Sequence, residues 1–282
     1  MLKIHFINVG KGNCTVIDFP SGHLTVIDTD NSRNTDENDL TDPIDFIKKQ
    51  YPNRDIFRLI ITHPDMDHLS GMEEIAENFK IYNFWDTENN KTLSQADLDK
   101  APYYEKEDWK TYQKFRKSTE SPKCINLYRN SNGDYWNSDN IKILSPSKAL
   151  VKKANDSGEY NHLSYVISIN YNGTKILLGG DATIAAWDEI LAELGEDELK
   201  ADIFLAPHHG SSYNVNKEVF KHIAPKHVVV SVIKGVDYDY TYYNTLAKNK
   251  VLSTKHYGNI SFHIDDNGKI EHIYVEKNAD SK

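Results

Sequence analysis

Apolar and polar side chains alternate along the first thirty residues of the chain. The alternation covers residues 3–9, 14–18 and 23–28, and turn-forming glycine, asparagine, proline and serine lie between them at 10–13 and 19–22. A period of two residues is typical of half-buried β-strands. The pattern therefore predicts an antiparallel meander of three strands joined by tight turns.

A change to helical periodicity follows this predicted meander. The segment Thr41-Asp42-Pro43-Ile44 offers a capping side chain and an early proline, so we predict a helix that runs from there towards Tyr51. The chain then alternates between short apolar runs and helical spacing. We predict a buried strand, a helix and a further strand, at residues 58–62, 71–79 and 80–85 respectively.

The second half of the chain returns to strands. Residues 165–171 and 174–178 flank Asn172-Gly173, a strong signal for a two-residue β-hairpin turn. A helix is predicted at 187–194. The other predicted strands are 141–144, 203–206, 227–232 and 251–253, with a closing hairpin of 259–264 and 269–275. This mixture predicts an α/β fold in which two sheets pack together with helices outside, as one continuous domain over residues 1–282.

Residues 86–122 differ in composition from the rest, because they are rich in Asp, Glu, Lys, Asn and Tyr. Trp109, Tyr112 and Phe115 follow helical spacing, which favours an amphipathic helical insertion on the surface. The alternative is a lid or substrate platform, in which Tyr103, Tyr104 and Trp109 would be available for stacking.

Composition limits the class of protein. The chain has 39% hydrophobic and 27% charged residues and a formal net charge of −9. No apolar run approaches the roughly 20 residues that span a membrane, and the N-terminus lacks a signal-peptide pattern. Cys14 and Cys124 are far apart and indicate reduced thiols. We therefore expect a cytoplasmic protein without a membrane segment, and the negative charge argues against tight non-specific binding to duplex DNA.

Four residues of metal-ligand type lie within six positions, between a predicted strand and a predicted helix. They are His63, Asp65, Asp67 and His68. Side chains at positions i and i+2 of an extended segment point the same way, so His63 and Asp65 can bind one ion. Asp67 and His68 diverge and can face a second. Asp67 could instead cap the helix, but four such residues together favour a metal site.

Two later segments at predicted strand ends supply further ligand candidates. Asp181 follows Gly179-Gly180, whose glycines allow close approach of the backbone. The adjacent pair His208 and His209 follows the strand at 203–206. His162 precedes the strand at 165–171, and whether it is a ligand or a second donor stays open. The remaining histidines are interpreted as structural or surface residues: His5, His23, His222, His227, His256, His263 and His272.

The order of these motifs resembles the metallo-β-lactamase fold. More specifically, it looks like the soluble metallo-β-lactamase-like domain of the ComEC family of competence proteins. The motif His-x-Asp-x-Asp-His and the motif His-His-Gly-Ser carry the resemblance most specifically. The matching segments cover nearly the whole chain: residues 6–13, 26–29, 62–71, 178–181, 207–211, 228–231, 253–254 and 257–260.

The resemblance implies a four-layer αββα sandwich with two divalent metal ions, zinc or manganese, at one edge of the sheets. Matched residue by residue, the resemblance implies that His63 and Asp65 bind one ion. It implies that the other ion is bound by Asp67, His68 and one histidine of the His208–His209 pair, with His208 slightly favoured. Asp181 is then implied to bridge the two ions. The chain departs from the family at 236–243, where a histidine is expected but Asp239 and several tyrosines stand, and mildly at Leu69-Ser70-Gly71.

The leading hypothesis is a dinuclear phosphodiesterase or nuclease. Two metals roughly 3.5–4 Å apart can hold a bridging hydroxide for in-line attack at phosphorus. Asp67 would orient the nucleophile, and His209, His162 or Lys11 would protonate the leaving oxygen or hold the phosphate. Single-stranded nucleic acid or a nucleotide is the expected substrate. An aspartate at position 65 makes the site harder and favours manganese somewhat.

Two other hypotheses stay open. The same metals could hydrolyse a small molecule such as a cyclic nucleotide, lactone or thioester. Alternatively, the domain binds metal or a partner without turnover, in which case the acidic, tyrosine-rich segments 86–122 and 236–243 are surfaces for a protein partner.

Overall fold

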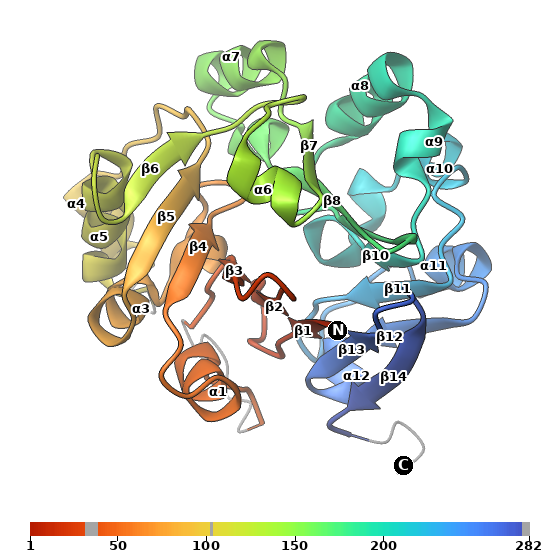
Figure 1. The fold of residues 1–282 in the computed structure, drawn as a ribbon. Helices are drawn as coiled ribbons and strands as arrows, with labels where there is room; N and C mark the ends of the chain where they lie inside the picture. The colour runs from red at the N-terminus through yellow and green to blue at the C-terminus, as the bar shows by residue number, and fades with distance from the viewer. Residues whose placement is uncertain (32–38, 102–103, 278–282) are drawn as a thin grey trace.

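Two β-sheets form the centre of the protein in a computed structural model that describes residues 1–31, 39–101 and 104–277 (Figure 1). Within these residues the first sheet has the strand order β14-β13-β1-β2-β3-β4-β5-β6 and the second the order β12-β11-β10-β9-β8-β7. The strands of the first sheet are β1 (Leu2–Phe6), β2 (Thr15–Asp18), β3 (Leu24–Ile27), β4 (Ile56–Ile60), β5 (Ile81–Asp86), β6 (Lys123–Asn126), β13 (Ile260–Ile264) and β14 (Ile270–Val275). Those of the second are β7 (Ile141–Ser145), β8 (Val166–Tyr171), β9 (Thr174–Leu178), β10 (Ile203–Leu205), β11 (His227–Val230) and β12 (Lys250–Ser253).

Helices connect many of these strands. The α-helices are α1 (Pro43–Gln50), α2 (Met66–Leu69), α3 (Met72–Asn78), α4 (Gln95–Asp99), α5 (Lys106–Arg116), α6 (Asp134–Ser138), α7 (Lys148–Ser157), α8 (Ile184–Leu194), α9 (Glu196–Leu199), α10 (Lys217–Phe220), α11 (Tyr240–Leu246) and α12 (Thr254–Tyr257). Short 3₁₀ turns are η1 (Tyr160–Leu163), η2 (His208–Gly210) and η3 (Ser212–Asn214).

The alternation of apolar residues along the strands creates three buried layers. On β4, Ile60 faces the core between the two sheets, whereas Leu59 faces the core under α1, α3 and α5. On the second sheet, Leu178 faces the inter-sheet core and Leu177 packs towards α8 and α10. Successive side chains of a strand point to opposite faces, so each sheet is covered on both sides. The expected αββα sandwich is confirmed, and Figure 1 shows the helices outside the two sheets.

The direction of the strands brings the predicted ligand segments together. Strands β3, β4, β5 and β6 pair in parallel, as do β9, β10, β11 and β12. In parallel sheets the carboxyl ends of the strands lie at one edge, which is where open α/β folds bind ligands. The loops after β4, β9 and β10 carry the motifs at residues 62–68, 179–181 and 207–211.

Most predicted elements form close to their expected places. The hairpin of β8 and β9 over Asn172-Gly173 is confirmed, and so is α1, whose N-cap Asp42 accepts from the backbone N–H groups of Ile44 and Asp45. The strand predicted at 58–62 is two residues too late, since β4 is Ile56–Ile60. The sequence pattern also missed α2. Because α2 begins at Met66, the ligand motif is itself partly helical.

The polar segment 86–122 contains α4 and α5. The helix predicted from Trp109, Tyr112 and Phe115 is α5, but these three side chains are 6%, 0% and 6% exposed and pack in the core beneath the first sheet's helices. The ring of Trp109 is therefore closed to a stacked base, so this part of the platform hypothesis is wrong. Tyr103 lies outside the described residues. The role of the segment as a lid stays a prediction.

Helices of the described residues are too short or too polar to cross a lipid bilayer.

Candidate metal centre

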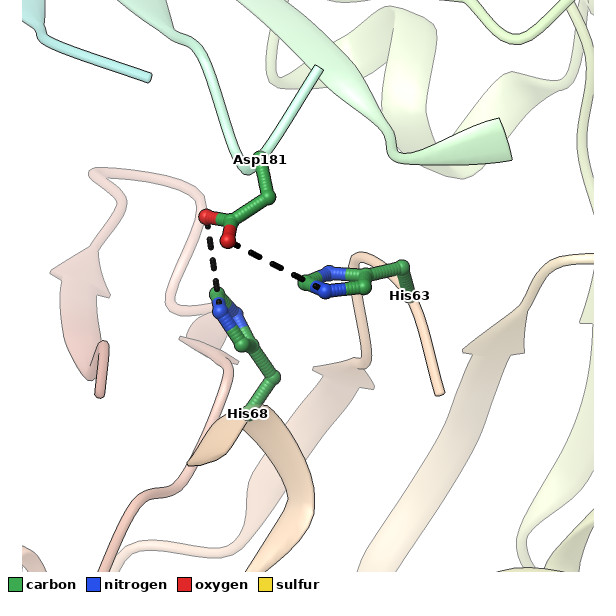
Figure 2. A group of neighbouring side chains, drawn as sticks. All are labelled: His63, His68 and Asp181. Carbon is green, nitrogen blue, oxygen red and sulfur yellow. Dashed lines mark ion pairs between the residues drawn. The ribbon is translucent and has the colours of Figure 1, made fainter. Parts of the chain in front are cut away.

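The first group of ligand atoms joins the two sheets. His63 lies in the loop after β4, His68 is in α2, and Asp181 follows β9. His63 Nε2 lies 4.0 Å from Asp181 Oδ2, and His68 Nε2 lies 3.4 Å from Asp181 Oδ1. Figure 2 shows the three side chains pointing toward one another. The motif after β4 and the aspartate after β9 therefore meet, as the sequence predicted.

A second group uses α2 and the loop after β10. It consists of Asp67, His68 and His209, and these residues, like the first group, have ligand atoms within 4.8 Å of one another. His209 Nε2 lies 3.8 Å from Asp67 Oδ2 and 3.7 Å from Asp181 Oδ2. His209 therefore connects the second group to the carboxylate of the first.

The buried atoms at the centre of these groups lack hydrogen-bond partners. They are His63 Nε2, His68 Nε2, Asp181 Oδ1 and His209 Nε2. Burying a polar atom without a partner costs about 1–3 kcal/mol, and a protein rarely gathers several such atoms at one point. Imidazole nitrogens and carboxylate oxygens are ligands of zinc and manganese. The residues present therefore fit a divalent metal centre.

Opposite charges within the groups shift the pKa values of their members. Burial opposes a charged imidazole, but the carboxylates of Asp181 and Asp28 outweigh burial and raise the pKa of His68 well above its ordinary value. Burial likewise opposes an ionised Asp181, but His68, His209 and His63 hold the pKa of Asp181 well below its ordinary value. A metal ion would take the place of a proton here, because a ligating histidine must be neutral.

Hydrogen bonds at Nδ1, the ring nitrogen that points away from the centre, orient the imidazoles of His68 and His209. His68 Nδ1 lies 2.8 Å from Asp28 Oδ2, and His209 Nδ1 lies 3.2 Å from the carbonyl oxygen of Ser231. Each Nδ1 thus donates a hydrogen, so Nε2 is the nitrogen that faces the centre and would offer its lone pair to a metal in the neutral imidazole. Metal-bound histidines are oriented by partners of this kind.

Asp28 is a residue of the site that sequence reasoning did not single out. It follows β3 directly, with φ of 57°, a left-handed conformation that is uncommon for a residue with a side chain. Its carboxylate accepts from the backbone N–H of Thr62 at 2.8 Å, from the hydroxyl of Thr62 and from His68. The signal was present, since Asp28 belongs to the segment 26–29 that matches the ComEC-like pattern.

His208 differs from its neighbour in exposure and hydrogen bonding. Its Nε2 lies 3.9 Å from Asp181 Oδ2, but its side chain is 38% exposed and it is in neither ligand group. Its Nδ1 accepts from the amide of Asn214. His208 is therefore engaged with Asn214 through one ring nitrogen, whereas His209 directs a buried ring nitrogen without a partner at the centre.

Asp65 stands between the first group and a lysine. Its Oδ2 lies 3.4 Å from His63 Nε2, and its Oδ1 forms an ion pair with Lys91. Burial raises the pKa of Asp65, but His63 and Lys91 outweigh burial and hold it below its ordinary value. Asp65 is the N-cap residue of α2 without a side-chain capping bond. Its carboxylate therefore contacts His63 and Lys91 and does not cap the helix, although Asp65 is in neither ligand group.

His162 contacts the loop that carries Asp181. Its Nδ1 lies 2.8 Å from Thr183 Oγ1, and its Nε2 lies 3.1 Å from the carboxylate of Glu159. Both ring nitrogens have partners, and His162 is in neither ligand group. Burial is the largest influence on its pKa, which is lowered. A catalytic part for His162 stays a prediction.

Two glycines allow the loops to approach so closely. A Cβ on Gly12 would lie 1.8 Å from the carbonyl oxygen of Asp67, and a Cβ on Gly180 would lie 2.4 Å from Ser164 Oγ. Ser164 Oγ accepts from the backbone N–H of Asp181 at 2.9 Å, which fixes the carboxylate's position. The turn at Gly10–Gly12 thus packs closely against the backbone of α2. Lys11, the middle residue of this turn, is exposed.

The segment 236–243, where the family's histidine is missing, lies beside the His208–His209 loop. A Cβ on Gly210 would lie 3.0 Å from Tyr238 Cβ, and the backbone N–H of Asp239 donates to the carbonyl oxygen of Gly210. Asp239 caps α11 by accepting from Tyr242 N–H at 3.1 Å. It is in neither ligand group.

Comparison with known proteins agrees with the observed fold. The sequence profile of the Metallo-beta-lactamase superfamily matches residues 7–232, and the chain belongs to this superfamily. Fold, membership and ligand groups together indicate a metal-dependent hydrolase. The chain is also 23% identical over 221 residues to ComE operon protein 3 of Bacillus subtilis, which covers 78% of this chain and 25% of that protein. The ComEC-like resemblance is thereby confirmed, although the chain spans only about a quarter of this relative's length.

Solved structures share the fold at low sequence identity. The metallo-beta-lactamase fold protein YhfI from Bacillus subtilis matches with a TM-score of 0.54 and 9% identity, over 93% of this chain and 100% of that one. Igni18, a metallo hydrolase from Ignicoccus hospitalis, matches with a TM-score of 0.51 and 16% identity, over 93% and 100%. Zn(2+)-bound PqqB from Methylobacterium extorquens matches with a TM-score of 0.54 and 8% identity, over 93% and 100%.

Proposed function

We propose that the protein is a phosphodiesterase or nuclease with two divalent metal ions. The observation that carries this proposal is the convergence of four buried ligand atoms without hydrogen-bond partners, contributed by both sheets. Zinc and manganese are the candidate ions. When bound, such ions act as Lewis acids and lower the pKa of water to near neutrality.

The ligands divide between the two ions in a way that the distances favour. His68 Nε2 has a single lone pair, so it binds one ion only. We assign His68 to the second ion with Asp67 and His209, and Asp65 joins His63 on the first. Asp181 would be shared between the two ions, because its carboxylate lies 3.4 Å from His68, 4.0 Å from His63 and 3.7 Å from His209.

This assignment prefers His209 to His208 as the ligand from the loop after β10. His209 Nε2 is buried without a partner, whereas His208 is partly exposed and its Nδ1 accepts from Asn214. His208 is then left to face the substrate. Asp67, whose side chain is 20% exposed, would orient the attacking water in this proposal.

The phosphodiester substrate is favoured by two features. The position that Asp65 occupies is a histidine in the more general superfamily motif and an aspartate in the ComEC-like branch, and oxygen ligands suit harder ions such as manganese. The similarity to ComE operon protein 3 is the second feature, because phosphodiester hydrolysis is the activity that the ComEC-like resemblance implies. Single-stranded DNA, RNA or a nucleotide is the substrate class proposed.

Elemental analysis followed by a substrate panel tests this function. Protein purified without chelator is expected to hold two equivalents of zinc or manganese and to hydrolyse bis(p-nitrophenyl) phosphate or single-stranded nucleic acid. His63→Ala should lose metal and turnover together. His222→Ala is the matched control, since His222 pairs with Glu196 on α9 away from either ligand group.

Other results would point to another function. Cleavage of a lactone, thioester or cyclic nucleotide alone would make the protein a small-molecule hydrolase. Full metal content without turnover of any of these substrates would contradict an enzymatic role and favour a metal-binding partner domain.

A further inference from the structure

Lys91 lies next to the candidate metal centre, on the loop between β5 and α4. Its ammonium group binds Asp65 Oδ1, while the other oxygen of that carboxylate faces His63 at 3.4 Å. The positive charge therefore lies one carboxylate away from the first ligand group. Among the ion pairs of the described residues, Lys91 is the lysine or arginine that pairs with a residue of the centre.

The lysine is held in place from the other half of the chain. Asn155 of α7 accepts from the backbone N–H of Asn90 at 2.9 Å and donates to the carbonyl oxygen of Glu88 at 2.9 Å. Asn90 Nδ2 donates to the carbonyl oxygen of Asn155 at 3.2 Å, and Tyr160 OH donates to Asn90 Oδ1 at 2.9 Å. These bonds fix the loop at 88–91 against α7 and η1.

The ring of Tyr160 also positions the charge itself. Lys91 Nζ lies 5.4 Å from the centre of that ring, within the range of a cation–π contact. The Lys91 side chain is 16% exposed, whereas Lys152 on α7, in an ordinary surface ion pair with Asp156, is 75% exposed. Lys91 is thus a partly buried cation that keeps an opening to solvent beside the centre.

We propose that Lys91 binds the phosphate group of substrate and product at the candidate metal centre. This inference rests on the proposed phosphodiesterase function. An ammonium has three N–H donors, and Asp65 accepts one of them. A phosphodiester is an anion that must approach the carboxylates of Asp65, Asp67 and Asp181. The fixed ammonium group of Lys91 beside them offsets the repulsion between the phosphate and these carboxylates. Asp65 can keep Oδ1 on Lys91 while Oδ2 binds metal.

Binding of inorganic phosphate to the metal-loaded protein tests the proposal without turnover. In isothermal titration calorimetry, Lys91→Gln should raise the Kd for phosphate about tenfold or more, as expected for loss of a charge-assisted hydrogen bond. Metal content should equal that of the unaltered protein. Lys91→Arg should retain part of the affinity, and Lys152→Gln, the matched control on α7, should bind phosphate normally.

Tyr160 supplies a second variant. Tyr160→Phe keeps the ring beneath Lys91 but removes the hydroxyl that donates to Asn90, so it should weaken phosphate binding less than Tyr160→Ala does. Neither substitution should cause a further loss when combined with Lys91→Gln. An unchanged phosphate Kd in Lys91→Gln would overturn the proposal. A loss of metal in Lys91→Gln would overturn it too, because Lys91 would then act through Asp65 alone.

The same measurements separate this proposal from the proposed function. Weaker phosphate binding in Lys91→Gln, together with no phosphodiester turnover in the unaltered protein, would support the anion site and contradict the phosphodiesterase. With turnover present, Lys91→Gln should raise KM for bis(p-nitrophenyl) phosphate more than it lowers kcat.

Discussion

At the scale of single residues, the candidate metal centre depends on groups outside its two ligand groups. Asp28 is the best example, since it joins β3, the backbone at Thr62 and the imidazole of His68. Because its carboxylate accepts a hydrogen bond from His68 Nδ1, a neutral His68 carries its hydrogen on Nδ1 and its lone pair on Nε2. Such outer partners typically change metal affinity by about 10–100-fold when altered.

Asp28→Asn should therefore weaken zinc binding by about 10–100-fold. Asparagine tolerates the left-handed backbone at this position, so the fold should be kept. Competition with a chromophoric chelator measures the affinity. Asp18→Asn, which alters an aspartate on β2 that pairs with Arg54, is the control. Equal zinc affinity in Asp28→Asn and the unaltered protein would show that Asp28 does not position His68.

His5 gives a prediction about pH. Burial, helped by the charges of His263 and Lys3, lowers the pKa of His5 to about 3 from its ordinary 6.5. The folded protein keeps His5 neutral between Tyr51 and Ser261, whereas the unfolded chain takes up a proton below pH 6.5. Stability from this residue is thus complete above pH 6.5 and is lost as pH falls, at about 1.4 kcal/mol per pH unit.

His5→Gln should flatten this dependence. Urea unfolding in the presence of chelator, between pH 8 and pH 4, should show a slope smaller by about one proton than in the unaltered protein. The substitution will also lower stability at pH 8, but the slope is a separate observable. His272→Gln, on the exposed face of β14, should leave the slope unchanged. An unaltered slope in His5→Gln would refute the prediction.

At the scale of elements, α5 shows how a polar segment attaches to the fold. Its residues Glu107, Lys110 and Lys114 are exposed, whereas Asp108 is buried together with Trp109, Tyr112 and Phe115. Tyr112 also donates to the buried carboxylate of Asp86 at 2.6 Å, and Arg116 pairs with that carboxylate. The helix is therefore anchored by an apolar stripe and a buried polar network.

Trp109→Ala should lower the free energy of unfolding by about 3–5 kcal/mol, because a large buried aromatic side chain is removed and a cavity is left. Urea unfolding of the metal-free protein measures this. Lys110→Ala alters the adjacent, exposed residue of the same helix and should stay within about 0.5 kcal/mol. A similarly small effect of Trp109→Ala would mean that α5 is not part of the folded core.

Element by element, the sequence was most informative where a local signal is strong. Alternation and turn residues predicted β8 and β9, and the capping aspartate predicted α1. The helical turn α2 was missed because its four residues are too few to show a period. In the site, spacing predicted the residues that meet, but the preference between His208 and His209 depends on Asn214 and Ser231, which sequence spacing does not connect to them.

At the scale of the whole molecule, the metal centre is a junction between the two sheets. His63, Asp67 and His68 follow strands of the first sheet, whereas Asp181 and His209 follow strands of the second. The two sheets also meet here through the polypeptide itself, because the backbone N–H of Tyr165 donates to the carbonyl oxygen of Thr62 at 3.0 Å. Bound metal would add direct bonds across the same junction.

Metal should therefore stabilise the whole fold and not one loop. A ligand that binds only the folded state adds about 4 kcal/mol at a thousand times its Kd, so zinc should raise the Tm and chelator should lower it. His63→Ala in the first sheet's loop and Asp181→Asn in the second's should each remove most of this increment, and the double variant should remove little more. Scanning calorimetry measures all three. If Asp181→Asn kept the full increment, the ions would be held by the first sheet alone, and the proposed bridging of the two sheets would be wrong.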